Sequence, residues 1–175
     1  MKILGLLRHA KSDWGQSDKR DFDRGLNTRG RKGAALIGEH IRDHGVKWDT
    51  LIASPAQRVK VTLEAAAIGP EPRWDDRLYL ASTDTIFDVI REDAGDAAAV
   101  LVAGHNPGLG DMLFELVAPA QENALFDEAK VKFPTAAFAV YELAIDDWAD
   151  LKEGCGTLVH FARPRDLDPD LGPEH

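Results

Sequence analysis

Three short, continuous apolar runs constrain the fold of this chain more than any other feature. They cover residues 3–7, 51–53 and 99–103, and they end at Arg8, at Ser54 and at Gly104-His105. A run without polar alternation is typical of a strand that is buried on both faces, as in a parallel sheet covered by helices. The three runs therefore predict the central strands of such a sheet.

Segments with helical spacing separate these runs. Asn27 or Thr28 is a good cap for a helix that continues to Gly45, and its apolar side chains recur at helical spacing. Ser54-Pro55 and Asn106-Pro107 predict two more helix starts, since proline is favoured in the first turn. A further helix is predicted to start at residue 82 or 83.

Two late strands complete the predicted sheet. Residues 136–143 and 156–162 have strand patterns and can pair with each other, whereas residues 119–133 are polar and irregular. The alternation of strands and helices predicts an α/β fold, a three-layer sandwich with a mostly parallel central sheet flanked by helices. We expect a single domain over residues 1–163 and a flexible C-terminal tail over residues 164–175.

The charge and the cysteine content exclude several classes of partner and site. The chain has 21 basic and 30 acidic residues, and its formal net charge of −9 disfavours nucleic acid and anionic membranes as partners. Its single cysteine, Cys155, cannot form an internal disulfide. The apolar run before Arg8 is too short to span a membrane. These features predict a cytoplasmic protein.

Basic and imidazole side chains follow the predicted strands where ligands bind in such sheets, at the carboxyl ends. Arg8-His9, Arg58 and His105 all occupy such positions. Arginine can bond two phosphate oxygens at once, and nearby guanidinium charges keep His9 neutral, so that it can attack phosphorus. His105 and the arginines can stabilise the charge of the transition state. Ser12 lies in the polar loop that follows and is a further candidate for binding phosphate.

No metal ion or other cofactor is predicted. The aspartates do not form a magnesium-binding motif. The remaining histidines show no ligand spacing with one another, and we interpret them as surface or packing residues; they are His40, His44, His160 and His175.

Four sequence blocks, in order, resemble the histidine phosphatase superfamily and within it the short SixA-type phosphohistidine phosphatases. The blocks are Leu7-Arg8-His9-Ala10, Leu26-Asn27-Thr28-Arg29-Gly30, Ser54-Pro55-Ala56-Gln57-Arg58 and Gly104-His105-Asn106-Pro107. The similarity extends from Met1 to about Ala162 and implies a phosphoglycerate mutase-like fold. Two residues depart from the family pattern, namely Ala10 in place of glycine and Gly15 in place of asparagine.

The resemblance also implies roles for individual residues. His9 would be the nucleophile that forms a transient phosphohistidine, Arg8 and Arg58 would bind the phosphoryl group, and His105 would be the second histidine of the pocket. Asp76, in the Asp75–Tyr79 segment, stands where the family has its general acid. Without the resemblance, the sequence is equally consistent with Asp76 as a solvated aspartate in a turn or as a partner of Arg77.

The substrate is predicted from the length of the chain. The segment between Arg58 and His105 is mostly accounted for by core elements, which leaves little chain for a roof over the pocket. An open pocket favours phosphohistidine on a partner protein, such as a histidine-containing phosphotransfer domain, over an enclosed metabolite. Two alternatives remain: hydrolysis of a small phosphate ester, such as a sugar phosphate or nucleotide, and a non-catalytic phosphate-binding module.

Overall fold

The computed structural model describes residues 1–15 and 18–171 and contains one six-stranded sheet. The strand order is β3-β2-β4-β1-β5-β6. Neighbouring strands among the first four are parallel, whereas β5 is antiparallel to both β1 and β6. The mostly parallel sheet and the pairing of the two late strands are thus confirmed. The strands are β1 (Lys2–Arg8), β2 (Thr50–Ala53), β3 (Pro72–Trp74), β4 (Ala99–Gly104), β5 (Phe138–Leu143) and β6 (Gly156–Ala162).

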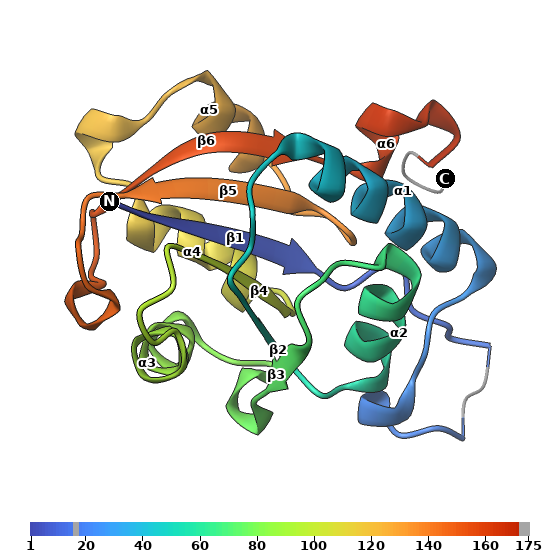
Figure 1. Ribbon diagram of the computed structural model, residues 1–175. Coiled ribbons are helices and arrows are strands. Elements are labelled where there is room, and N and C mark those ends of the chain that lie inside the picture. The colour runs from blue at the N-terminus through green and yellow to red at the C-terminus, as the bar shows by residue number, and fades with distance from the viewer. Residues whose placement is uncertain (16–17, 172–175) are drawn as a thin grey trace.

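Helices cover both faces of this sheet, which gives the predicted three layers (Figure 1). On one face α1 and α2 pack against each other, and on the other α3, α4 and α5 contribute to a second core cluster. The helices are α1 (Thr28–His44), α2 (Gln57–Ala66), α3 (Thr83–Asp93), α4 (Gly108–Leu116), α5 (Ala124–Ala129) and α6 (Pro164–Leu167). Short 3-10 turns cover Asp21–Asp23 (η1), Asp76–Leu78 (η2), Pro119–Gln121 (η3), Trp148–Asp150 (η4) and Pro169–Leu171 (η5).

The central strand β1 supplies both cores because its side chains alternate between the two faces. Leu4 and Leu6 lie in the core beneath α3 and α4, whereas Leu7 lies in the core beneath α1 and α2. Gly5 shares the face of Leu7, and a Cβ atom at this position would lie 2.5 Å from the ring of Trp48. The glycine therefore lets the indole pack directly against the strand.

Two helix starts agree with the sequence prediction, and one differs. The Asn27 side chain accepts a hydrogen bond from the Gly30 amide (2.7 Å), and the Ser82 side chain accepts one from the Thr85 amide (3.4 Å). The helix start predicted at Ser54-Pro55, with Ser54 as the N-cap, is wrong, because α2 begins at Gln57 and its N-cap is Ala56. The backbone of Ser54 still pairs with β4, which delays the start of the helix.

The chain is more regular near its C-terminus than the sequence indicates. Helix α5 lies within the segment expected to be irregular, and it packs Phe126 and Ala129 into the core. The expected flexible tail begins instead with α6, which contacts α1. Ion pairs from Arg163 to Asp166 (3.0 Å) and to Glu128 (2.8 Å) hold the start of α6 in place. Residues 172–175 of the predicted tail lie outside the described residues.

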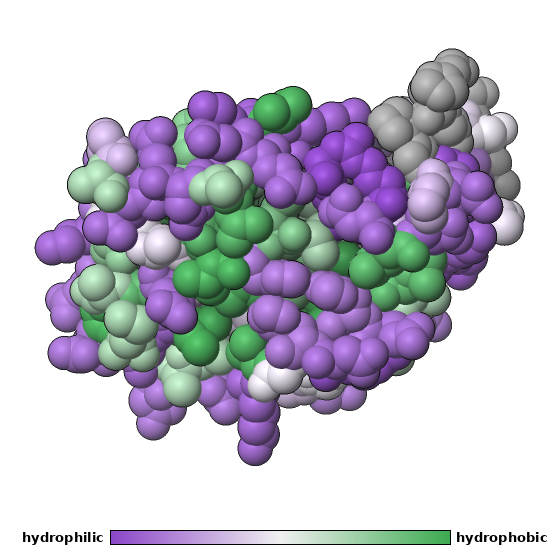
Figure 2. Space-filling view, turned by 90° about the horizontal axis from the view of Figure 1, so that it is seen from above, coloured by the Kyte–Doolittle hydropathy of each residue, from purple (hydrophilic) through white to green (hydrophobic). Residues whose placement is uncertain are grey.

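Hydrophilic side chains cover most of the face seen from above, and apolar side chains form smaller patches between them (Figure 2). In the part of the chain that the structure describes, no helix is both long enough and apolar enough to cross a bilayer.

Candidate active site

The ends of three neighbouring strands hold the first part of the site. The His9 amide donates to the Gly104 carbonyl at the end of β4 (3.0 Å), and the His9 carbonyl accepts from the Ala136 amide (2.9 Å). The Arg8 amide donates to the Ala137 carbonyl (3.1 Å). The backbone of Arg8 and His9 is therefore fixed between β4 and the start of β5, so that their side chains emerge at the carboxyl end of β1.

A cavity of about 620 Å³ opens at these strand ends, and we call it the strand-end cavity. Its lining includes residues from the ends of β1 and β4, the first turn of α2 and the loop after β1. Five of the six candidate site residues line it together: Arg8, His9, Ser12, Arg58 and His105.

His9 is held in one tautomer by its neighbour. Its Nδ1 lies 2.7 Å from the Ala10 carbonyl oxygen, and because a carbonyl only accepts, Nδ1 must carry the proton. The lone pair is then on Nε2. The pKa of His9 is lowered to about 3, mainly by burial. The charges of Arg8 and Arg58 act in the same direction, and the hydrogen bond to Ala10 opposes them. The ring is consequently neutral near pH 7 and can act as a nucleophile.

The second imidazole lies close to the first. The ring centroids of His9 and His105 are 5.3 Å apart, and His105 Nε2 lies 2.8 Å from the Ser54 hydroxyl oxygen. Burial, followed by the charge of Arg58, lowers the pKa of His105 to about 4. Its Nδ1 is buried and has no hydrogen-bond partner among the described residues. In neutral His105, Nε2 is thus hydrogen-bonded to the Ser54 hydroxyl, and Nδ1 is available to contact a ligand in the cavity.

Arg58 is anchored by an aspartate that the sequence did not single out. Its Nη1 donates to the Asp21 backbone carbonyl (2.8 Å), and its Nη2 forms an ion pair with the Asp21 carboxylate (3.0 Å). The Tyr79 hydroxyl donates to the same carboxylate. The hydrogen bond from Tyr79 and the Arg58 guanidinium lower the pKa of Asp21, so it is ionised at neutral pH. Nothing in the polar loop around Asp21 distinguishes it from its acidic neighbours before η1 folds against α2.

Arg8 completes a strongly cationic corner of the cavity. Its Nη1 donates to the Phe133 carbonyl (3.2 Å), but its Nε is buried without a partner among the described residues. Burial and the neighbouring Arg58 charge both lower the pKa of Arg8. Two guanidinium groups that repel each other in a buried corner favour an anion between them, because it offsets their repulsion and satisfies their N–H groups.

Comparison with known proteins identifies the family. The family model described as "Histidine phosphatase superfamily (branch 1)" matches residues 4–79. A solved structure from Nakamurella multipartitia, assigned as a phosphohistidine phosphatase SixA, is 32% identical and superposes with a TM-score of 0.82 over 93% of this chain and 96% of that one. This chain belongs to the histidine phosphatase superfamily. It is therefore a hydrolase of the phosphatase class, and its α/β architecture is phosphoglycerate mutase-like.

Two other proteins are similar to this chain over most of its length. A structure from Agrobacterium tumefaciens, also assigned as a SixA, is 29% identical and has a TM-score of 0.74 over 93% of this chain and 98% of that one. An uncharacterized protein of Mycobacterium tuberculosis is 33% identical over 160 residues, which cover 91% of this chain and 100% of the relative. The similarity to the two SixA structures thus extends well beyond residues 4–79, which the family model matches.

The loop after His9 is held over α1 by a close approach that suits glycine. A Cβ atom at Gly30 would lie 2.2 Å from the Lys11 carbonyl oxygen, so a larger residue there would displace the loop. Ser12, the candidate of that loop, is buried and forms an isolated antiparallel bridge with Leu26. In this histidine phosphatase the block at residues 26–30 therefore shapes the cavity through its backbone.

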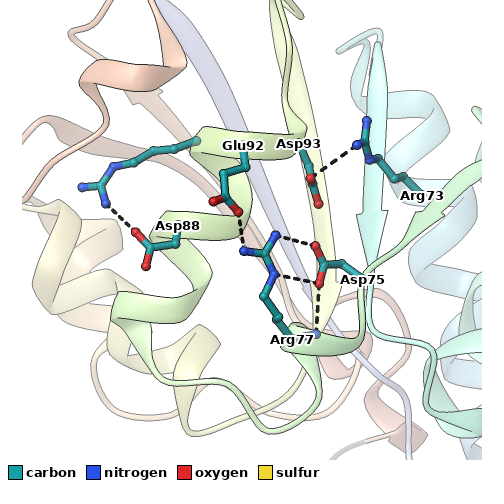
Figure 3. A network of polar contacts seen from close by, with 7 residues as sticks. Arg73, Asp75, Arg77, Asp88, Glu92 and Asp93 are labelled. Atoms are coloured by element: carbon teal, nitrogen blue, oxygen red, sulfur yellow. Dashed lines mark hydrogen bonds and ion pairs between the residues drawn. The ribbon is translucent and has the colours of Figure 1, made fainter.

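Asp76, where the resemblance placed a general acid, does not line the strand-end cavity. It is exposed at the start of η2, and the buried Leu78 fixes this turn beside α3. The neighbouring Asp75 is engaged in an ion pair with Arg77 (2.9 Å), and Arg77 also contacts Glu92 of α3 (Figure 3). The structure thus brings Asp21, and not Asp76, to the cavity.

Proposed function

We propose that this histidine phosphatase transfers a phosphoryl group from phosphohistidine on a partner protein to His9 and then to water. The observation that carries this proposal is the hydrogen bond between His9 Nδ1 and the Ala10 carbonyl. It leaves Nε2, which carries the lone pair, as the reactive atom in a cavity that also contains two guanidinium groups. A neutral imidazole beside fixed cations suits attack on a phosphoryl group.

In the first step, Nε2 of His9 forms a bond to phosphorus while the bond from phosphorus to the leaving nitrogen breaks. Arg8 and Arg58 hold the phosphoryl oxygens in line with the attacking nitrogen, and they stabilise the charge that these oxygens carry in the transition state. His105 contributes a further N–H donor from Nδ1 when the Ser54 hydroxyl donates to Nε2.

In the second step, water attacks phosphorus, inorganic phosphate leaves, and His9 returns to its neutral form. The proton stays on Nδ1 throughout, hydrogen-bonded to the Ala10 carbonyl, so His9 ends the cycle in the same neutral tautomer in which it began. Neither step uses a proton from a side chain of the cavity.

The ionised state of Asp21 favours a phosphohistidine substrate over a phosphate ester. Asp21 is the one carboxylate among the described residues that line the cavity, and its lowered pKa leaves it without a proton to donate. An alkoxide leaving group needs such a proton. A phosphoimidazole can instead take a proton from water on its second ring nitrogen and leave as neutral imidazole.

The rim of the cavity supports a protein as the carrier of the phosphohistidine. Trp14 and Leu80, which are 67% and 53% exposed, both contribute to the lining. Lys132 and Arg165 also contribute, although the chain as a whole is acidic. Exposed apolar and basic side chains around one opening suit an acidic protein surface, such as that of a histidine-containing phosphotransfer domain. We place this partner, and the enzyme, in the cytoplasm.

Rapid-quench phosphoryl transfer from a phosphohistidine protein tests the proposal. The wild type should form an acid-labile phosphoryl adduct on His9, and His9→Ala should form none and turn over at least about 10³-fold more slowly. His44→Ala, which removes a histidine outside the cavity, should behave like the wild type.

Two results would contradict the proposal in different ways. A preference of several orders of magnitude for sugar phosphates or nucleotides would assign the enzyme to small esters. Tight binding of phosphate without any adduct under quench conditions would instead indicate a binding module.

A further inference from the structure

Three histidines that show no common pattern in the sequence meet near the C-terminal end of α1. His40 and His44 are one turn apart in the last part of α1, and His160 is in β6. One ring nitrogen from each can be chosen so that all three lie within 4.8 Å of one another. We call these residues the outer histidine cluster. The sequence shows no ligand spacing among them, and the fold brings them together because the helix lies beside β6 and presents residues four apart to the same strand.

We propose that the outer histidine cluster binds one divalent transition-metal ion, with Zn²⁺ as the best fit, through His40, His44 and His160. A zinc ion holds imidazole nitrogens at about 2.0–2.1 Å, which puts neighbouring ligand nitrogens about 3.3 Å apart in a tetrahedron. In the structure, His40 Nε2 and His160 Nε2 are 2.8 Å apart. The rings of His40 and His44 stack on that of His160 with interplanar angles of 18° and 28°, so the side chains rotate for their lone pairs to converge on one ion. Water completes the coordination.

The donor atoms of the cluster suit a transition-metal ion. A neutral imidazole carries one ring-nitrogen lone pair, which is the donor that a metal ligand must present. Imidazole nitrogen prefers Zn²⁺, Cu²⁺ and Ni²⁺ over Mg²⁺ and Ca²⁺, which take oxygen ligands.

Phe138 gives the cluster a rigid apolar wall. Its ring centroid is 6.4, 6.1 and 5.9 Å from those of His40, His44 and His160. Phe138 is fully buried in β5, where it pairs with Leu7 of β1. Phe138 therefore bounds the cluster on the side of the sheet.

A bound ion would tie together two elements that are far apart in the sequence. Helix α1 and strand β6 pass each other in the upper part of Figure 1, and the ion would bridge them. Because the unfolded chain does not present these ligands together, binding would stabilise the folded state. None of the three histidines lines the strand-end cavity, so the metal site is independent of phosphoryl transfer.

Zn²⁺ titration of the tag-free full chain, followed by calorimetry, tests the site. We expect one equivalent to bind with a Kd of about 1 μM. At a free Zn²⁺ concentration about 100 times the Kd, the melting temperature should rise by about 5 °C. His44→Gln and His160→Gln should each weaken binding about 100-fold. His9→Gln, the matched control in the cavity, should bind Zn²⁺ like the wild type.

Loss of Zn²⁺ binding in His9→Gln with retention in the two cluster variants would overturn the proposal, and so would the absence of stoichiometric binding by the wild type below about 1 mM. The phosphatase activity of the cluster variants, which should equal that of the wild type, reports whether they fold. Anomalous diffraction at the zinc edge from wild-type crystals needs no variant. Density between His40, His44 and His160 would support the site, and density only elsewhere would refute it.

Discussion

Histidines lie close together in two regions of the molecule, the strand-end cavity and the outer histidine cluster. In both regions the pKa values of histidines are lowered, but the neighbouring side chains differ. In the strand-end cavity, burial brings the pKa of His9 to about 3 and that of His105 to about 4, beside two arginines. In the outer histidine cluster, burial and other histidines bring the pKa of His160 to about 4, and the rings of His44 and His160 stack 4.1 Å apart. Both places therefore hold neutral imidazoles at pH 7.

The difference between these two places lies in what surrounds the lone pairs. Fixed guanidinium groups beside His9 favour an anion, and they make its lone pair a nucleophile toward a bound phosphoryl group. The outer cluster has imidazoles and the Phe138 ring as neighbours, so its lone pairs can converge on a cation. A lowered histidine pKa thus identifies an available lone pair, and the charges around it decide which ligand the site takes.

Arg58→Ala should have the largest effect on the strand-end cavity while leaving the outer histidine cluster unchanged. Removing this guanidinium takes away both a phosphoryl ligand and a stabilising charge, and we expect kcat/KM for a phosphohistidine protein to fall about 10³-fold. Zn²⁺ affinity should stay within twofold of the wild type. Arg58→Lys keeps the charge without the planar fork and should recover part of the loss. A fall of less than tenfold in Arg58→Ala would mean that the cavity does not select its anion through this arginine.

The pH dependence of stability tests whether His9 is neutral in the folded protein. Its pKa of about 3 is below the ordinary value of 6.5, so the unfolded chain binds the additional proton first as the pH falls. The stability contributed by neutral His9 is complete above pH 6.5 and is lost progressively toward pH 3. Between pH 7 and pH 5, the wild type should lose about 2 kcal/mol more free energy of unfolding than His9→Asn, which cannot titrate.

Urea unfolding at the two pH values measures this difference, and phosphate-free buffer keeps the cavity from binding an anion. Parallel losses in both proteins would show that His9 has an ordinary pKa, and the similarity between the two histidine groups would disappear.

The sequence was sufficient for the elements whose signal is local. Continuous apolar runs identified β1, β2 and β4, and side-chain caps at Asn27 and Ser82 identified the starts of α1 and α3. Since parallel strands end at one edge of the sheet, the same runs predicted that Arg8, His9, Arg58 and His105 would line one cavity. These predictions needed only neighbours in the chain and one rule of topology.

The features that the sequence did not predict depend on distant contacts. The carboxylate of Asp21 becomes a partner of Arg58 only when η1 packs against α2. The outer histidine cluster forms only because α1 lies beside β6, which brings His40 next to His160, 120 positions further along the chain. Helix α5 has a short apolar face, and its burial against the core outweighs its weak local pattern.

Asp21→Asn tests how strongly the phosphatase activity depends on the ion pair that positions Arg58. The amide keeps an oxygen acceptor for Nη2, and the backbone carbonyl still accepts from Nη1, but the ionic part of the contact is lost. We expect kcat to fall about tenfold and KM to change by less than threefold, as for a residue that acts through another. Tyr79→Phe removes only the hydroxyl that contacts Asp21 and should have a smaller effect. A larger effect on KM than on kcat would mean that Asp21 contacts the substrate directly.

Asp76→Asn should have the smallest effect, because the side chain is exposed at η2 and is not part of the cavity lining. We expect kcat/KM to stay within twofold of the wild type for a phosphohistidine protein and for an alkyl phosphate. A general acid would show a fall of about 10²–10⁴-fold with the alkyl phosphate and much less with phosphohistidine, since only the alkoxide needs its proton. Such a split would mean that η2 moves into the cavity when substrate binds, so that a carboxyl group joins the arginines and imidazoles there. An unchanged rate with both substrates would mean that Asp76 donates no proton to the leaving group. The two arginines would then remain the feature that distinguishes the histidines of the cavity from the outer cluster.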